Sequence, residues 1–405
     1  MRNEKDESTS GAILGAIHPE IQRRNVASGH RKLIELIRAE IAERGALSFA
    51  RFMELALYHP DYGYYASGRA NIGRAGDFFT NVSVGSCFGY LLAAQFAEVW
   101  QQSGSPSLFT IVEQGAHDAL FASDALTALS RFRTHCFNAL HYIVIEPFSI
   151  WRERQKKTLA AFQHKVHWVQ TVDELESFSG IYFANELFDA VPVHLITSGT
   201  REEPGNWQER RVTAVGDHFE LVSAPIRDPE LRAQTDRLGS LPPDFRTEIN
   251  LAAPDLMCEV AGKLSQGVIL TIDYGFPRAQ FYSQDRNEGT LQIRSGHRKL
   301  SSPFEKIGRA DISAHVEWTS LAEAAEQAGA SLLGFADQYH FFTGIIADTA
   351  IDMLGELNKQ ALQTLLHPEL LGRSFQALAL AENFGGSLSG YRYSREPRAE
   401  LGMTT

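Results

Sequence analysis

Five short apolar runs in the middle of the chain constrain the fold more than any other feature. They lie at residues 109–112, 142–145, 166–169, 181–184 and 268–272, and helical patterns separate several of them. Runs of this length are typical of buried strands, and strands that alternate with helices indicate a parallel sheet covered on both faces. We therefore expect an α/β fold in which the strand C-termini meet at one edge.

Other segments predict additions to this core. Apolar residues recur at helical spacing from Arg31, Gly45 is placed to end that helix, and Ser48 can cap the next one. An antiparallel hairpin is expected around the Gly216-Asp217 turn. We predict a flexible leader, a helical N-terminal cap, a core with a β-hairpin insertion and a C-terminal extension, at residues 1–29, 30–105, 106–350 (insertion about 197–246) and 351–405.

Composition excludes several classes of protein. The 405 residues carry a formal charge of −11 and include three cysteines, too few for a disulfide scaffold and without the paired spacing of a zinc site. The negative charge argues against binding to nucleic acid. No secretory signal and no apolar stretch of about 20 residues is present. We expect a cytoplasmic protein with neither a metal site nor a membrane span.

Carboxylates follow four of the expected strands. Glu113 ends the first, Glu146 the second, Glu186 and Asp189 follow the fourth, and Asp273 follows the fifth. Ligands of open α/β sheets bind beyond the strand C-termini, so four acidic edges suggest a site. A structural role stays open for each position, as a helix cap, a solvated helix start, a strand-end turn or an acceptor for loop amides.

The pattern favours a nucleoside ligand without phosphates. Gly115 permits a tight turn against a ligand, and Glu146 lies one strand-helix-strand unit after Glu113, where a carboxylate can accept from both ribose hydroxyls. The further glycines of a dinucleotide-binding loop are missing, and no Walker lysine motif is present. S-adenosylmethionine fits these observations, and a nicotinamide oxidoreductase is disfavoured.

A second group of residues lies upstream. The loop at 72–81 contains Gly76, Asp77 and Thr80, which can contact a zwitterion, or can form a turn before a helix. Four tyrosines between Tyr58 and Tyr65 precede it, as a core cluster or as a lid over a ligand.

These segments resemble the MidA family of S-adenosylmethionine-dependent methyltransferase-like proteins, which includes a mitochondrial complex I assembly factor. The resemblance spans about residues 32–345 and rests on long motifs in the family's order, at 58–65, 76–80, 185–193, 272–275, 289–291, 296–298 and 311–316. It implies a Rossmann-like, seven-stranded methyltransferase sheet and protein arginine methylation. It also implies that Gly76, Asp77, Thr80, Glu113, Gly115, Glu146 and Asn185 hold the cofactor.

One departure from the family pattern concerns the loop after the first strand. The family's loop carries three glycines, and here His117 and Ala119 stand at the second and third positions. A Cβ at each narrows the loop or demands ordinary φ values.

The resulting hypothesis is methyl transfer to a protein arginine. A guanidinium is charged at any working pH, so we expect Glu186 to grip it and Asp189 or Asp273 to support it. The alternatives are a small-molecule methyltransferase and an inactive assembly protein. Expected partners are a protein substrate, such as a respiratory-complex subunit, or a small molecule, and a homodimer is conceivable.

Overall fold

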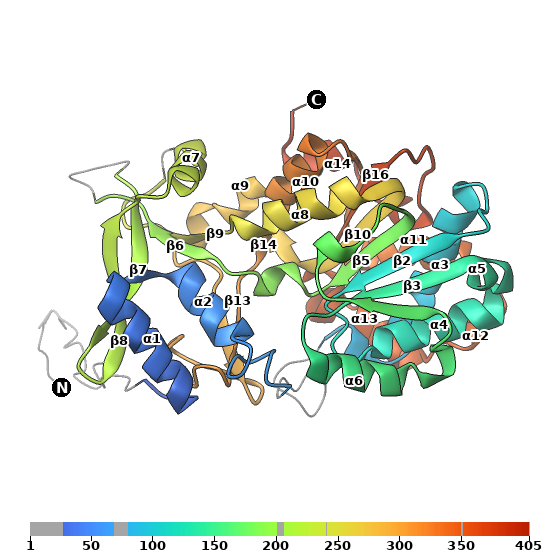
Figure 1. The fold of residues 1–405 in the computed structure, drawn as a ribbon. Coiled ribbons are helices and arrows are strands. Elements are labelled where there is room, and N and C mark those ends of the chain that lie inside the picture. Colours follow the sequence, from blue (N-terminus) through green and yellow to red (C-terminus); the bar gives the residue numbers. More distant parts are fainter. Residues whose placement is uncertain (1–26, 69–79, 201–205, 240, 350, 405) are drawn as a thin grey trace, which may run out of the picture.

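Two parts of the molecule lie side by side in Figure 1, an α/β core at the right and a smaller module of strands and helices at the left. This arrangement agrees with the predicted α/β fold with a helical cap and an inserted hairpin. Most of the predicted leader, with Gly76 and Asp77, lies outside the described residues. The computed structural model describes residues 27–68, 80–200, 206–239, 241–349 and 351–404.

The core is built on one mixed sheet, which has eight strands in the described part of the chain. The strands are β2 (Phe109–Gln114), β3 (Leu140–Ile145), β4 (Val166–Val169), β5 (Phe178–Asn185), β10 (Leu264–Phe276), β14 (Val316–Glu317), β15 (Ser331–Asp337) and β16 (Phe375–Glu382). Seven follow the order β4-β3-β2-β5-β10-β16-β15, and the short β14 pairs with the end of β10. The expected count of seven strands therefore holds only for the continuous path.

Helices cover both faces of this sheet because its strands are apolar on both sides. Ile111 faces one hydrophobic cluster and its neighbour Val112 faces the other, as the two-residue period of a strand requires. The first cluster is packed by α3 (Cys87–Gln102), α4 (Leu120–Phe132), α5 (Thr134–Ala139), α11 (Gln338–Asp348), α12 (Ile351–Gly355) and α13 (Lys359–Leu366). The second is packed by α8 (Ala252–Lys263), α10 (Trp318–Gln327) and α14 (Pro397–Leu401).

The strand β16 extends the core sheet beyond residue 350, where the sequence suggested that the core ends. It inserts between β10 and β15 and runs antiparallel to both. Its sequence, Phe-Gln-Ala-Leu-Ala-Leu-Ala-Glu, is rich in residues that favour helices. Burial on both faces, with Ala377 to Leu380 fully buried, overrides this propensity.

The left-hand module combines the N-terminal cap with the insertion. Gly45 ends α1 (Arg31–Arg44) with φ 81°, and Ser48 caps α2 (Phe49–Tyr58) by accepting from the Arg51 N–H, both as predicted. The predicted hairpin is present, but it belongs to a five-stranded sheet whose outer member β9 extends past residue 246. These strands are β1 (Leu47–Ser48), β6 (His194–Thr197), β7 (Gln208–Val215), β8 (His218–Pro225) and β9 (Arg246–Ile249).

A third, small sheet joins this module to the core. Its strands are β11 (Gln292–Ser295), β12 (Arg298–Lys299) and β13 (Asp311–Ser313). In the chain, α7 (Pro229–Arg237) follows β8 and α9 (Arg278–Phe281) follows β10. The backbone N–H of Ala314, just after β13, donates to the carbonyl of Asp189 beyond β5. None of the helices within the described ranges is both long and apolar enough to cross a membrane.

Candidate functional site

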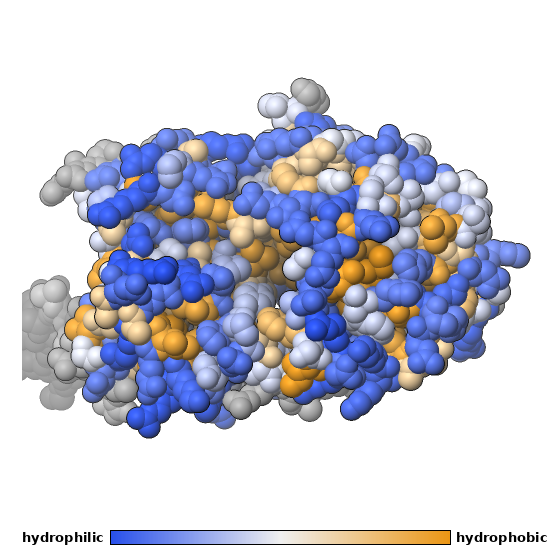
Figure 2. All heavy atoms as spheres, viewed as in Figure 1, coloured by the Kyte–Doolittle hydropathy of each residue, from blue (hydrophilic) through white to orange (hydrophobic). Residues whose placement is uncertain are grey.

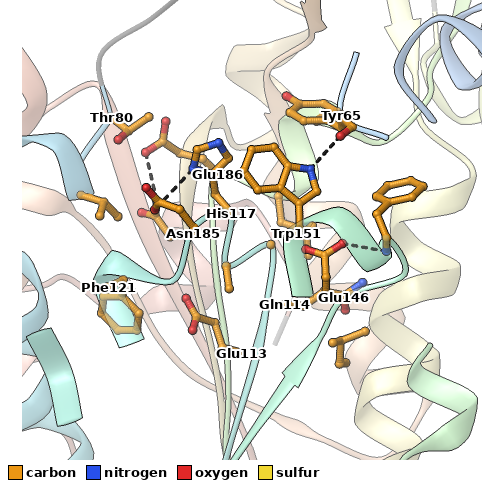
Figure 3. A pocket seen from close by; sticks show the side chains of 18 of the residues that line it. Tyr65, Thr80, Glu113, Gln114, His117, Phe121, Glu146, Trp151, Asn185 and Glu186 are labelled. Carbon is orange, nitrogen blue, oxygen red and sulfur yellow. Dashed lines mark hydrogen bonds and ion pairs between the residues drawn. The ribbon is translucent and has the colours of Figure 1, made fainter. Parts of the chain in front are cut away.

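A cavity of about 340 Å³ lies at the C-terminal ends of β2, β3 and β5 (Figure 3). This volume falls in the usual range for small-molecule sites. The described residues that the sequence predicted for a site meet here, with the exception of Asp273. Those that line the cavity are Thr80, Glu113, Gly115, Glu146, Asn185, Glu186 and Asp189.

The loop after β2 adopts the shape of a glycine loop although it contains only one glycine. Gly115 has φ 82°, and His117 and Ala119 have φ 48° and 62°. All three lie in the left-handed region, which costs roughly 1–2 kcal/mol for a residue with a Cβ. Of the two consequences expected for side chains at 117 and 119, ordinary φ values are therefore wrong, because tertiary contacts hold the loop in place.

Glu113 lies at the floor of the cavity. Its side chain is 4% exposed, and its Oε2 accepts from the Tyr142 hydroxyl at 2.7 Å. Burial disfavours the charged carboxylate and raises the pKa of Glu113 to about 8, although the hydrogen bond from Tyr142 acts in the opposite direction. Glu113 is thus a proton-holding group at neutral pH.

Glu146 projects from the end of β3 on the other side of the loop. Its Oε1 accepts from the Phe148 N–H at 2.9 Å, and its Oε2 accepts from Gln155 Nε2 at 3.0 Å. Burial raises the pKa of Glu146, which these two donors and the nearby Arg152 counteract. Each carboxylate oxygen has a second acceptor site, so this residue can still receive a ribose hydroxyl.

Asn185 and Glu186 form a hydrogen-bonded group with Asn81 beyond β5. Asn185 Nδ2 donates to Glu186 Oε1 at 3.0 Å, and Asn185 Oδ1 accepts from Asn81 Nδ2 at 3.2 Å. The Asn81 N–H also donates to Glu186 Oε1 at 3.2 Å. Burial raises the pKa of Glu186 to about 8 despite these donors. Glu186 itself has φ 52°, a strained conformation that turns the chain at the cavity wall.

Asp273 lies behind the cavity wall and does not line it. Its Oδ2 accepts from the N–H groups of Phe188 and Asp189 at 2.9 and 3.2 Å, and its Oδ1 accepts from the Tyr274 N–H at 2.7 Å. Burial raises the pKa of Asp273 to about 7 against these donors. Its contacts hold the turn that carries Asp189, which is a positioning role.

Several residues of the site were not predicted from the sequence. Trp151 Nε1 donates to the Tyr65 carbonyl at 2.7 Å, and its ring lies 4.2 Å from that of His117. Asp311, from β13, accepts from the Tyr65 hydroxyl at 2.7 Å. These contacts join positions far apart in the sequence: Tyr65 and His117 were named from the sequence, Asp311 only as part of the motif at 311–316, and Trp151 not at all.

The cavity suits a nucleoside cofactor. Gly115 exposes its backbone to the cavity, and a Cβ there would meet Leu187 Cδ1 at 3.3 Å. Glu146 can accept from ribose hydroxyls, and Ile145, Pro147 and Leu187 provide apolar walls for a base. This donor set contains no phosphate cradle.

A family model described as "Putative S-adenosyl-L-methionine-dependent methyltransferase" matches residues 91–336, more than half of the chain. This protein belongs to that family. The match covers β2, β3 and β5, which carry most of the cavity wall, and the cofactor is S-adenosylmethionine.

Curated relatives extend the similarity to most of the chain. The Drosophila melanogaster protein named "Protein arginine methyltransferase NDUFAF7 homolog, mitochondrial" is 26% identical, over 90% of this chain and 87% of its own length. The Homo sapiens protein of the corresponding name is 25% identical, over 89% and 85%. Because these relatives are named as mitochondrial, the expected cytoplasmic location is contradicted.

A solved structure supports the cofactor. A crystal structure from Burkholderia thailandensis with bound S-adenosyl-homocysteine has a TM-score of 0.81 and 29% identity, and the alignment covers 91% of this chain and 96% of that one. The two chains thus share both the core and the left-hand module.

Proposed function

We propose that this protein transfers the methyl group of S-adenosylmethionine to an arginine side chain of another protein. The names of the curated relatives support an arginine acceptor. The observation that carries the proposal is a group of buried and half-buried carboxylates at the cofactor cavity, which we call the acidic cluster: Glu186, Asp189, Asp273 and Asp311.

The acidic cluster is suited to a guanidinium. Burial and, after it, the neighbouring carboxylates raise the pKa of Asp189 well above its ordinary value. Burial likewise dominates the raised pKa of Glu186, to which Asp273 and Asp311 add. Within the described ranges, no ion pair joins Glu186, Asp189 or Asp273 to a cationic side chain. A permanently charged guanidinium would provide the missing positive charge and favour the ionised carboxylates.

Each residue of the site then has a separate role in the reaction. When bound, the cofactor supplies a methyl group on a positively charged sulfur. Glu186 holds the guanidinium and keeps its charge away from the attacking nitrogen, so that this nitrogen can offer its electron pair. Asp273 holds the turn that positions Asp189. Alignment of the reacting atoms contributes more than acid–base chemistry in such a displacement.

The proposal also covers the identity of the acceptor protein and the oligomeric state. We propose a subunit of a respiratory complex as a candidate acceptor, in line with the mitochondrial relatives. A homodimer is a candidate assembly, which sedimentation of the purified protein would test. A small-molecule acceptor is favoured only by the aromatic wall of Tyr58, Tyr65 and Trp151 at the cavity.

Glu186→Gln tests the assignment. Labelled methyl transfer is measured on arginine-containing peptides and on the same peptides with lysine in place of arginine. We expect transfer only to arginine, a loss of more than 100-fold in Glu186→Gln, and S-adenosyl-homocysteine affinity within about threefold of wild type.

The exposed Glu153, on the outer surface of α6 (Ser149–Thr158), provides the matched control. Glu153→Gln should retain wild-type transfer. Full activity in Glu186→Gln, or equal transfer to the lysine peptides, would contradict the proposed function.

A further inference from the structure

The helix α6 contributes a buried polar side chain next to the cofactor cavity. Gln155 has 0% exposure although it carries an amide. The three hydrogen bonds of its side chain are all to groups outside its own helix. A buried amide without hydrogen-bond partners costs roughly 1–3 kcal/mol. Both ends of this amide have partners, which indicates a specific role for the side chain.

Two of the three side-chain partners of Gln155, His117 and Glu146, line the cofactor cavity. Nε2 donates to the carbonyl of His117 at 2.8 Å and to Glu146 Oε2 at 3.0 Å. On the other side, Oε1 accepts from Trp168 Nε1 at 2.9 Å. The Trp168 contact fixes the orientation of the amide, since an indole N–H can only donate and must face the amide oxygen, which leaves the –NH₂ end for His117 and Glu146.

The contact with His117 explains how the loop keeps its shape without the usual glycines. His117 has φ 48°, and a residue with a side chain keeps such a conformation only when its surroundings hold it. Gln155 anchors its carbonyl, and the Trp151 ring packs against its imidazole at 4.2 Å. Trp151 and Gln155 lie four positions apart, on the same face of α6.

We propose that Gln155 is a positioning residue for the cofactor, which sets the loop at 115–119 and the Glu146 carboxylate in one fixed relation. It binds no ligand itself and does not line the cavity. Glu146 and His117 do line it, and Figure 3 shows Glu146 below Trp151 at the cavity edge. The inference rests on the S-adenosylmethionine site and is independent of the methyl acceptor.

The test is calorimetric titration of purified protein with S-adenosyl-homocysteine. Gln155→Met keeps the side-chain length and removes the donor and the acceptor, and we expect it to weaken binding about tenfold or more. Gln155→Glu keeps the shape but places a carboxylate against Glu146, and we expect a larger loss. If Gln155→Met fails to fold, the titration uses Gln155→Glu, which also removes the two N–H donors to His117 and Glu146. Gln163→Met is the matched control, because it makes the same change at an exposed glutamine that does not line the cavity.

A double-mutant cycle separates positioning from general structural support. If Gln155 acts through Glu146, then Glu146→Gln and Gln155→Met together should weaken binding by clearly less than the product of the single effects. A merely structural Gln155 would lower the melting temperature of the ligand-free protein and leave the affinity unchanged. Unchanged affinity or multiplicative effects would overturn the proposal alone. Absence of binding to the wild-type protein would overturn the cofactor site together with it.

Discussion

Two carboxyl groups with raised pKa values lie at the ends of β2 and β5, Glu113 buried and Glu186 half-buried. Glu113 and Glu186 both have pKa values raised to about 8, chiefly by burial. Acidic groups in such surroundings are typical of functional sites, although structural clusters also perturb pKa values. Here the two carboxylates have different environments, since Glu113 receives a tyrosine hydroxyl and Glu186 receives amide donors.

Replacement of Glu113 should change how stability depends on pH. The folded protein keeps a proton on Glu113 up to about pH 8, whereas the ordinary value is 4.5. The folded state therefore binds more protons, and stability falls as the pH rises from about 4.5 to about 8. Glu113→Gln removes this loss and should stabilise the protein at pH 8.5 by up to roughly 5 kcal/mol, with little effect at pH 5. Thermal unfolding at both pH values measures this, with exposed Glu176→Gln as the control.

Within the loop at 115–119, Gly115 is the position where an added side chain should lower stability and cofactor affinity. Gly115→Ala places a Cβ at φ 82°, and at 3.3 Å from Leu187 Cδ1. We expect a loss of roughly 1–2 kcal/mol in the free energy of unfolding, together with weaker binding of S-adenosyl-homocysteine. Gly262→Ala, near the end of α8 with no atom within 4 Å of the added Cβ, should instead stabilise by about 0.5–1 kcal/mol. Equal effects of the two changes would contradict this view of the loop.

At the scale of elements, β16 shows how tertiary context decides secondary structure. Its alanines and leucines suit a helix, yet it fills the gap between β10 and β15. All eight residues of β16 pair with β10, from Phe375 opposite Tyr274 to Glu382 opposite Gly267. The pairing leaves no open edge at the centre of the sheet.

A chain that ends at residue 350 should therefore fail to fold. It keeps every predicted core strand but loses β16, so that β10 and β15 expose unpaired backbone and apolar faces. We expect aggregation and no cooperative thermal transition, while the full chain unfolds with one under the same conditions. A soluble, cooperatively unfolding product would show that β16 is dispensable.

At the scale of the whole molecule, the acidic cluster is assembled from both parts of the chain. Glu186, Asp189 and Asp273 belong to the core, whereas Asp311 comes from the small sheet beside the left-hand module. Apolar patches interrupt the hydrophilic surface in the middle of the face shown in Figure 2, where the two parts meet. Tyr65, from the cap, contacts Asp311 and completes the connection.

Tyr65→Phe should separate acceptor binding from cofactor binding. The change removes one hydroxyl that donates to the Asp311 carboxylate at 2.7 Å, an interaction worth roughly 1.5–3 kcal/mol. We expect kcat/KM for the arginine acceptor to fall about tenfold, with S-adenosyl-homocysteine affinity unchanged. Tyr339→Phe, on the partly exposed face of α11, is the matched control. A drop in cofactor affinity alone would contradict the assignment of Tyr65 to the acceptor side.

The sequence by itself determined the elements whose signals are local. The five apolar runs became β2, β3, β4, β5 and β10, because buried parallel strands need continuous apolar residues. The carboxylates at their ends could be assigned to one edge, since parallel strands direct their C-termini the same way.

Only the tertiary structure decided which residues meet across long separations. It placed Asp311 near Asp189, held His117 in a left-handed conformation through Gln155, and turned an alanine-rich segment into β16. It also directed Asp273 toward backbone N–H groups and away from the cavity. These outcomes depend on packing and hydrogen bonding between distant segments, which leave no periodic or local trace in the chain.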